Sequence, residues 1–159
     1  MPYYDSIAKG YEELYKEEQS NKVSIIKGSI SISKGTKILD VGCGTGISSD
    51  FECFVVGIDP SLKLLMLNKN PMRVLGLAES LPFKDKSFDY VISVTSIHNF
   101  DGIEKSISEM KRVGRHKFVF TILKKSAKLE SIKKSIEKSF KIDKELDEKK
   151  DIIMLCRKT

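Results

Sequence analysis

The sequence predicts an α/β protein built around a mostly parallel sheet, and three observations support this prediction. Short runs rich in Val, Ile and Phe recur along the chain, as is typical of strands buried on both faces. Apolar residues at helical spacing separate most of these runs, and such alternation implies right-handed crossovers within one sheet. Glycines 42, 44 and 46 follow the first run, at the carboxyl end of a strand, where parallel sheets bind their ligands.

The N-terminal part is predicted to be helical and to lead into the first two strands. Apolar residues at helical spacing indicate two helices, over residues 4–18 and 20–32, and Gly35 ends the pattern. The runs TKILDV (36–41) and FVVGI (54–58) are short, apolar and close to turn residues. We therefore expect them to be buried strands.

The middle of the chain continues the alternation. Ser61 is the expected N-cap of a short helix, and residues 73–76 form a brief third strand. The run FDYVISV (88–94) is the fourth strand. Asp101 and Glu104 have the spacing of a capping box, which predicts the start of the next helix.

The C-terminal part supplies one more crossover and two closing strands. The run KFVFTIL (117–123) is the fifth strand. Ser126 is the expected cap of a helix whose apolar residues, up to Phe140, share one face. Residues 142–146 and 152–157 are the last two predicted strands.

The composition is that of a globular protein with one domain. Of the 159 residues, 40% are apolar and 31% are charged, and no apolar run approaches the ~20 residues that cross a bilayer. The stretch MPYYDSIAKG lacks the basic and apolar parts of a secretory signal. Cys43, Cys53 and Cys156 have no CxxC spacing, which argues against a metal site and for a reducing compartment. We expect a cytoplasmic protein with a single domain over residues 1–159 and no bound metal.

The net charge of +6 is concentrated toward the C-terminus. Residues 1–123 hold 16 Lys and Arg against 15 Asp and Glu, whereas residues 124–159 hold 12 against 7. This basic stretch is either a solvated, lysine-rich surface or a surface that faces an acidic partner such as RNA.

The glycine turn after the first strand predicts a ligand site. Glycines at 42, 44 and 46 let the backbone turn sharply and approach a ligand closely. Ile47 stands where the dinucleotide motif GxGxxG has its third glycine, so the turn alone does not identify the ligand. Asp59 ends the second strand, where a carboxylate can accept hydrogen bonds from both hydroxyls of a ribose. No GK[ST] follows the turn, which excludes the phosphate loop of nucleotide hydrolases.

Four segments occur in the order found in one enzyme family. They are ILDVGCGTG (38–46), VVGIDPS (55–61), AESLPFKDKSFDYVIS (78–93) and SIHNF (96–100). With them the chain resembles the class I S-adenosylmethionine-dependent methyltransferases, in particular small stand-alone catalytic domains of the methyltransferase type 11 group. The resemblance covers about residues 3–123.

The resemblance implies a three-layer, Rossmann-like fold. Its seven-stranded sheet is mostly parallel, and the last strand is antiparallel. Residues 1–34 would supply helices that cap the cofactor site, residues 35–123 would form the cofactor-binding core, and residues 124–159 would add a basic helix and the closing strands.

The resemblance also implies that the cofactor is S-adenosylmethionine, with S-adenosylhomocysteine as the product. The glycine turn would border the methionine part, with Cys43 serving to pack the turn, and Asp59 would bind the ribose. Ala78 and Glu79 would lie at the adenine edge, and residues 93–95 would form the floor below the reacting methyl. The predicted cofactor-binding residues are Tyr4, Tyr11, Asp40, Gly42, Cys43, Gly44, Gly46, Asp59, Pro60, Ser61, Ala78, Glu79, Ser93, Val94 and Thr95.

The chain departs from the family pattern at two places. Leu77 stands where many relatives have an acid for the adenine amino group, so that backbone groups and apolar contacts would hold the adenine. Only residues 47–53 separate the glycine turn from the second strand, which reduces the usual helix to a turn or two and leaves an open wall.

The candidate catalytic residues are His98, Ser96 and Asn99. His98 follows the fourth strand and titrates near neutral pH, so it either accepts a proton or shapes the mouth of the pocket. Ser96 and Asn99 either orient the acceptor or bond within their loop. Because the donor methyl is already activated, no catalytic base is required.

Three functions stay open for the acceptor side. Methyl transfer to RNA is favoured, because Lys124, Lys125 and Lys128 follow the fifth strand and could contact phosphates. Methyl transfer to a small molecule is the first alternative, and a non-catalytic partner subunit with the same fold is the second. The resemblance to small RNA methyltransferases also implies a small zinc-containing activator protein as a partner.

Overall fold

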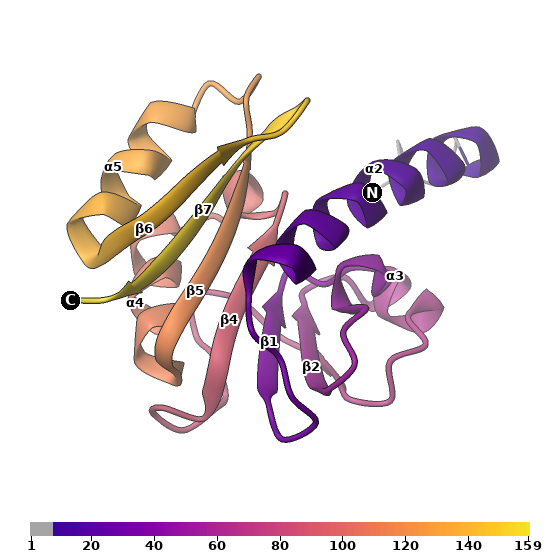
Figure 1. The fold of residues 1–159 in the computed structure, drawn as a ribbon. Coiled ribbons are helices and arrows are strands. Elements are labelled where there is room, and N and C mark those ends of the chain that lie inside the picture. Colours follow the sequence, from indigo (N-terminus) through magenta and orange to yellow (C-terminus); the bar gives the residue numbers. More distant parts are fainter. Residues whose placement is uncertain (1–7) are drawn as a thin grey trace.

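The computed structural model of the protein describes residues 8–159, with side chains from residue 13 onward (Figure 1). Within this range seven strands form one sheet, in the order β3-β2-β1-β4-β5-β7-β6. The strands are β1 (Lys37–Val41), β2 (Phe54–Asp59), β3 (Arg73–Leu75), β4 (Phe88–Val94), β5 (Gly114–Leu123), β6 (Phe140–Asp147) and β7 (Asp151–Lys158). Strand β7 runs antiparallel to both of its neighbours, β5 and β6, and the other pairs are parallel. The predicted fold class is confirmed.

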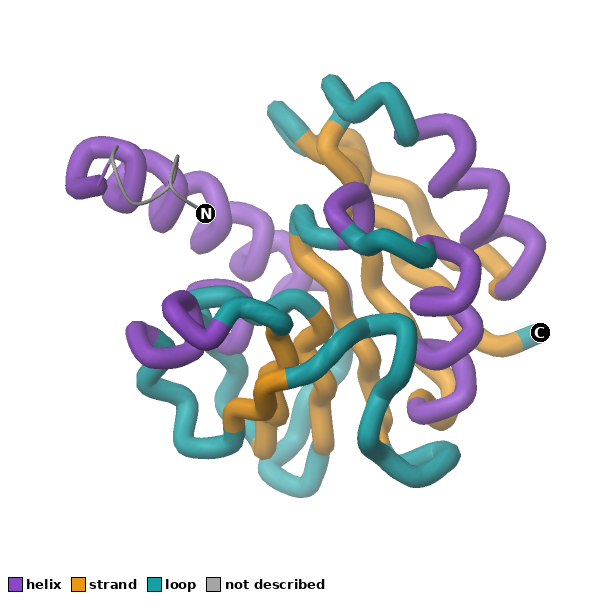
Figure 2. Tube along the Cα trace, turned by 180° about the vertical axis from the view of Figure 1, so that it is seen from behind, coloured by secondary structure: helices purple, strands orange, loops and turns teal. Residues whose placement is uncertain are grey.

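Helices cover both faces of the sheet and complete three layers. Helix α2 (Ala8–Ser29) crosses the near face in Figure 1, and its N-terminal half extends past the sheet above α3 (Leu62–Leu67). Helices α4 (Ile103–Val113) and α5 (Leu129–Ser139) cover the other face, which Figure 2 shows from behind. Two apolar cores follow from this arrangement, one under α2 and one under α4 and α5.

The prediction of two N-terminal helices is wrong, because α2 is continuous from Ala8 to Ser29. Gln19, Lys22, Val23 and Ile26 are all buried at helical spacing, so that one stripe runs across the predicted break. Glu18 and Gln19, at that break, are good helix formers, and neither Pro nor Gly interrupts the helix there. Residues 4–7 of the prediction lie outside the described residues.

Strand boundaries agree with the predictions to within a few residues, with one larger difference at β5. This strand begins at Gly114 rather than at residue 117, and Gly114 pairs with Phe88 of β4. A side chain at position 114 would meet the Phe118 ring at 2.5 Å, so the glycine lets β5 start early beside that ring.

The helix caps are confirmed at one of three predicted positions. Ser61 caps α3, because its hydroxyl accepts from the Leu64 amide at 3.2 Å. The predicted capping box before α4 is wrong: Gly102 is the N-cap, and its amide donates to the Glu79 carboxylate at 3.1 Å. Ser126 does not cap α5, since that helix begins only after Lys128.

The connection between β1 and β2 is a single 3-10 turn, η1 (Ile47–Ser49), as the short segment predicts. A hollow lies beside it, lined in part by Phe51, Phe54 and Met72, and the Phe54 side chain is 43% exposed. The wall at this side of the sheet is therefore open.

No helix in the described part of the chain is both long and apolar enough to cross a membrane.

Candidate functional site

The glycine turn between β1 and η1 has the backbone that its sequence requires. Gly42, Gly44 and Gly46 have φ angles of +80°, +51° and +92°, in the region that residues with side chains rarely adopt. The amides of Gly42 and Cys43 donate to the Ile58 carbonyl at 2.8 and 3.1 Å, which fastens the turn to β2.

The three glycines differ in what a side chain would meet. A Cβ at Gly42 would lie 2.6 Å from the Cβ of Ser96, and one at Gly46 would lie 2.6 Å from Asn68 Oδ1. A Cβ at Gly44 would meet nothing closer than a Leu64 methyl at 3.7 Å. Gly42 and Gly46 therefore permit close packing around the turn, whereas a side chain at Gly44 would have space.

Asp40, near the end of β1, is fully buried and forms hydrogen bonds with η1. The hydroxyls of Ser48 and Ser49 both donate to its Oδ2 atom at 2.7 Å, and Oδ1 has no partner among the described residues. Burial raises the pKa of Asp40 from an ordinary 3.8 to about 6, against the lowering effect of the two serine hydroxyls.

The raised pKa predicts how stability depends on pH. Between about pH 4 and pH 6 the folded protein binds more protons at Asp40 than the unfolded chain does, so its stability falls as the pH rises through this window. Asp40→Asn keeps an oxygen for both serines and cannot titrate. Relative to this variant, the free energy of unfolding of the wild type should fall by about 2 kcal/mol from pH 4 to pH 7, measured by urea unfolding. A difference between the two proteins that is constant over this range would contradict the assignment.

Asp59 joins the glycine turn to the start of α3. Its Oδ2 atom accepts from the Gly44 amide at 2.9 Å, and Oδ1 accepts from the Ser61 amide at 2.9 Å. A carboxylate has about four acceptor positions, so each oxygen can still accept one more hydrogen bond. The side chain is 8% exposed and fixed in orientation, which suits a ligand with two neighbouring hydroxyls.

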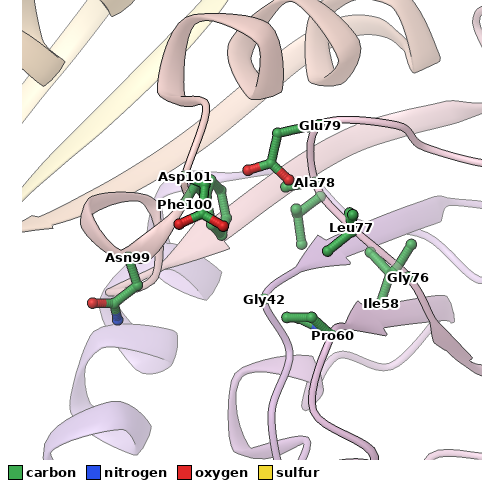
Figure 3. A pocket seen from close by; sticks show the side chains of 11 residues that line it. Gly42, Ile58, Pro60, Gly76, Leu77, Ala78, Glu79, Asn99, Phe100 and Asp101 are labelled. Atoms are coloured by element: carbon green, nitrogen blue, oxygen red, sulfur yellow. The ribbon is translucent and has the colours of Figure 1, made fainter.

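A small pocket, partly open to solvent, lies beside Gly42 (Figure 3). Residues 76–79 line one side and residues 99–101 the other, and the Glu79 carboxylate points across toward Phe100 and Asp101. Apolar side chains dominate the lining: Val41, Ile58, Leu77, Ala78 and Phe100. The pocket therefore suits a flat, weakly polar ring held by apolar contacts.

The loop that carries Ala78 and Glu79 is held by α4. The Arg112 guanidinium donates to the carbonyls of Leu81 and Phe83 at 2.9 and 2.8 Å. The Glu109 carboxylate accepts from Arg112 and from the Leu81 amide, and the hydrogen bonds from Arg112 lower the pKa of Glu109. One pair of side chains thus fixes this wall of the pocket.

The segment after β4 holds the candidate catalytic residues. The Ser96 hydroxyl donates to the Gly42 carbonyl at 3.0 Å, so this side chain ties the segment after β4 to the glycine turn. His98 lies in the 3-10 turn η2 (Ile97–Asn99), and its Nδ1 atom is buried without a partner among the described residues. Burial lowers the pKa of His98. Asn99 is exposed and lines the pocket.

Other predicted residues occupy varied places. Tyr4 lies outside the described residues, and Tyr11 lies on α2 in a stretch without described side chains. Cys43 packs inside the turn, where burial raises the pKa of its thiol. Ser93 and Val94 are buried in β4.

Sequence reasoning missed several supporting side chains. Asn68 is buried and donates to the Gly44 carbonyl at 3.0 Å. Lys22 and Asp151 form a buried ion pair beside Thr95, at 3.0 Å. Nothing in the local sequence singles these residues out, because their partners are remote along the chain.

The comparisons with known proteins agree with this geometry. The model of the methyltransferase domain family matches residues 39–120, which include the glycine turn, Asp59 and the segment after β4. Protein MJ1252 of Methanocaldococcus jannaschii is 37% identical over 125 residues, which are 76% of this chain and 50% of that protein. The demethylmenaquinone methyltransferase of Staphylococcus aureus is 32% identical over 69% of this chain and 53% of the enzyme. The chain thus spans about half the length of these relatives.

Solved structures share the fold at low sequence identity. A SAM-dependent methyltransferase of Aquifex aeolicus superposes with a TM-score of 0.74 at 14% identity, over 86% of this chain and 89% of that one. A Haloferax volcanii complex of the Trm112 methyltransferase activator with a methyltransferase gives 0.75 at 12% identity, over 95% of both chains. With the matched family model and the seven-stranded sheet, these findings show that the chain belongs to the class I S-adenosylmethionine-dependent methyltransferases.

Proposed function

We propose that the protein transfers the methyl group of S-adenosylmethionine to RNA. The main support is the open acceptor side of the sheet. Only residues 124–128 connect β5 to α5, and only residues 148–150 connect β6 to β7. Small-molecule sites usually enclose most of their ligand. No insertion of the described chain encloses the carboxyl ends of these strands, which favours a large acceptor.

The residues present fit the donor. The glycine turn would lie against the methionine part, because Gly44 leaves space that a side chain would fill. Asp59 would accept from the ribose hydroxyls, and Leu77, Ala78 and Phe100 would hold the adenine. When bound, the donor supplies an activated methyl, and the work of the chain is to position the acceptor.

His98 is the residue that we propose to receive a proton from the acceptor. Burial lowers its pKa, which favours the neutral imidazole that can accept a proton, and its turn follows β4 at the carboxyl edge of the sheet. His98→Ala should lower the single-turnover rate of methyl transfer about 100-fold and leave donor affinity unchanged. An equal loss in donor affinity would instead make His98 a residue that shapes the pocket.

Lysines beside the open edge support RNA as the acceptor. Lys124 pairs with Asp147 at 2.7 Å, Lys125 is exposed, and Lys128 donates to the His98 carbonyl at 3.3 Å. These three cations follow β5 directly, and Lys128 contacts the segment that carries the candidate catalytic residues. Phosphate oxygens could replace their present partners.

Removal of two of these lysines should weaken RNA binding without affecting the donor site. For Lys124→Ala with Lys125→Ala, we expect the slope of log affinity against log salt for tRNA to fall by roughly 1.4, about 0.7 for each lost phosphate contact. Lys138→Ala with Lys141→Ala makes the same charge change on exposed residues at the other end of the strands. An equal effect in both variants would show that Lys124 and Lys125 are ordinary solvated surface residues without a specific role in RNA binding.

A small-molecule acceptor is the second candidate, and the relationship to demethylmenaquinone methyltransferase favours it. A tritiated donor offered with total RNA, total protein and a metabolite extract separates these acceptors. Label in the metabolite fraction alone would overturn the RNA proposal. Calorimetry without heat of donor binding would favour the non-catalytic subunit.

We also propose a small zinc-containing activator protein as a partner. The described chain has no separate RNA-binding domain, and the Haloferax methyltransferase of the same fold is in complex with an activator. Co-purification with such a protein, with a gain in donor affinity, is the expected result.

A further inference from the structure

A buried ionic network joins α2 to the carboxyl ends of β4 and β5 and to the first residue of β7. The Lys22 ammonium donates to Thr95 Oγ1 at 3.0 Å and lies 3.0 Å from Asp151 Oδ1. Thr95 Oγ1 donates to Asp151 Oδ2 at 2.7 Å. The side chains of Lys22 and Asp151 are only 2% and 0% exposed, so that water does not screen the attraction between their charges.

Thr121 completes the network from β5. The Thr95 amide donates to Thr121 Oγ1 at 2.7 Å, and the two hydroxyl oxygens lie 3.1 Å apart. Since the Thr95 hydroxyl gives its proton to Asp151, Thr121 donates in this pair. The Thr95 hydroxyl then uses its full hydrogen-bonding capacity: it accepts from Lys22 and Thr121 and donates to Asp151.

The network holds Thr95 in an unfavourable backbone conformation. Its φ angle is +51°, a region that branched side chains rarely occupy, and such strain persists only where the surroundings impose it. Without these contacts, relaxation of Thr95 to negative φ would redirect the chain that follows.

That chain leads directly to the donor pocket. Ser96 comes next, and its hydroxyl bonds to the Gly42 carbonyl of the glycine turn. Asn99, Phe100 and Asp101 then form one wall of the pocket. We infer that Lys22 and Asp151 are positioning residues for methyl transfer, which act through Thr95 to set the glycine turn and residues 96–101. This inference rests on the proposed function.

The expected result of breaking the network is weaker donor binding and a looser pocket wall. Lys22→Met, Asp151→Asn and Thr95→Val should each lower affinity for S-adenosylmethionine about tenfold at temperatures well below unfolding. Amide hydrogen exchange of residues 95–101 should become faster in each variant, with and without donor. Thr95→Ser keeps the hydroxyl and should bind the donor about fivefold more tightly than Thr95→Val.

A matched control is available on the same elements. The ion pair of Glu18 and Lys150 also joins α2 to the turn before β7, but Lys150 is 53% exposed and does not contact Thr95. Lys150→Met should leave donor affinity and the exchange of residues 95–101 unchanged.

Exchange and affinity separate the two ideas. Folded variants of Lys22 and Asp151 in which residues 95–101 exchange as in the wild type would overturn the inference. The same holds if Lys150→Met has as large an effect. A wild-type protein that does not bind the donor would instead overturn the proposed function, and the exchange measurement would still report on the network.

Discussion

Asp59→Ala should weaken the binding of S-adenosylmethionine by at least about 100-fold. A hydrogen bond to a charged group contributes about 1.5–3 kcal/mol, and two ribose hydroxyls would lose their acceptor together. The substitution also frees the Gly44 and Ser61 amides, which both donate to this carboxylate. Isothermal titration with the donor and with S-adenosylhomocysteine measures the loss.

A change in the ligand separates the ribose contact from the loosened turn. The wild type should bind a 2′,3′-dideoxy analogue of the product about 100-fold more weakly than the product itself, whereas Asp59→Ala should bind both alike. Asp143→Ala removes a carboxylate from β6, far along the sheet from β2, and should leave both affinities unchanged. If Asp59→Ala still bound the product about 100-fold more tightly than the dideoxy analogue, Asp59 would not be the residue that binds the ribose hydroxyls.

Gly42→Ala should disrupt both the fold and the donor site. A residue with a side chain at φ +80° is strained by about 1–2 kcal/mol, and its Cβ would lie 2.6 Å from the Cβ of Ser96. Since both atoms are attached directly to backbone, one chain segment must move. We expect a loss of about 2–3 kcal/mol in the free energy of unfolding and at least tenfold in donor affinity.

Two further variants test the cause. Ser96→Gly combined with Gly42→Ala removes the clash and should recover part of the stability lost by Gly42→Ala alone. Gly44→Ala has space in the folded protein, with no atom closer than 3.7 Å, so it should lose donor affinity with a smaller loss of stability. If Gly44→Ala bound the donor as tightly as the wild type does, the ligand would not approach the turn at this position.

The strands and the donor motif could be predicted because their signals are local. Strand β4 matches its apolar run residue for residue, and Ser61 caps α3 through an amide only three residues away. The glycine turn and Asp59 are recognisable because a positive φ and a carboxylate at a strand end each require particular residues.

The errors share a physical cause, which is competition from remote partners. Asp101 and Glu104 have the spacing of a capping box, but Glu79, which is distant in sequence, reaches the Gly102 amide first. Lysines are usually solvated, so nothing predicted that Lys22 is buried against Asp151. Burial of Lys22 and its neighbours against the sheet likewise favours one continuous helix α2 in place of the two helices predicted.

The antiparallel strand β7 has a consequence for how the chain reaches its final form. During synthesis β6 emerges before β7, yet β6 joins the sheet only through β7. The ammonium of Lys22 likewise has to wait for Asp151, which lies far along the chain from it. Pairing across so long a separation closes a large loop and is slow. The nascent protein should therefore acquire a competent donor pocket only after translation of β7.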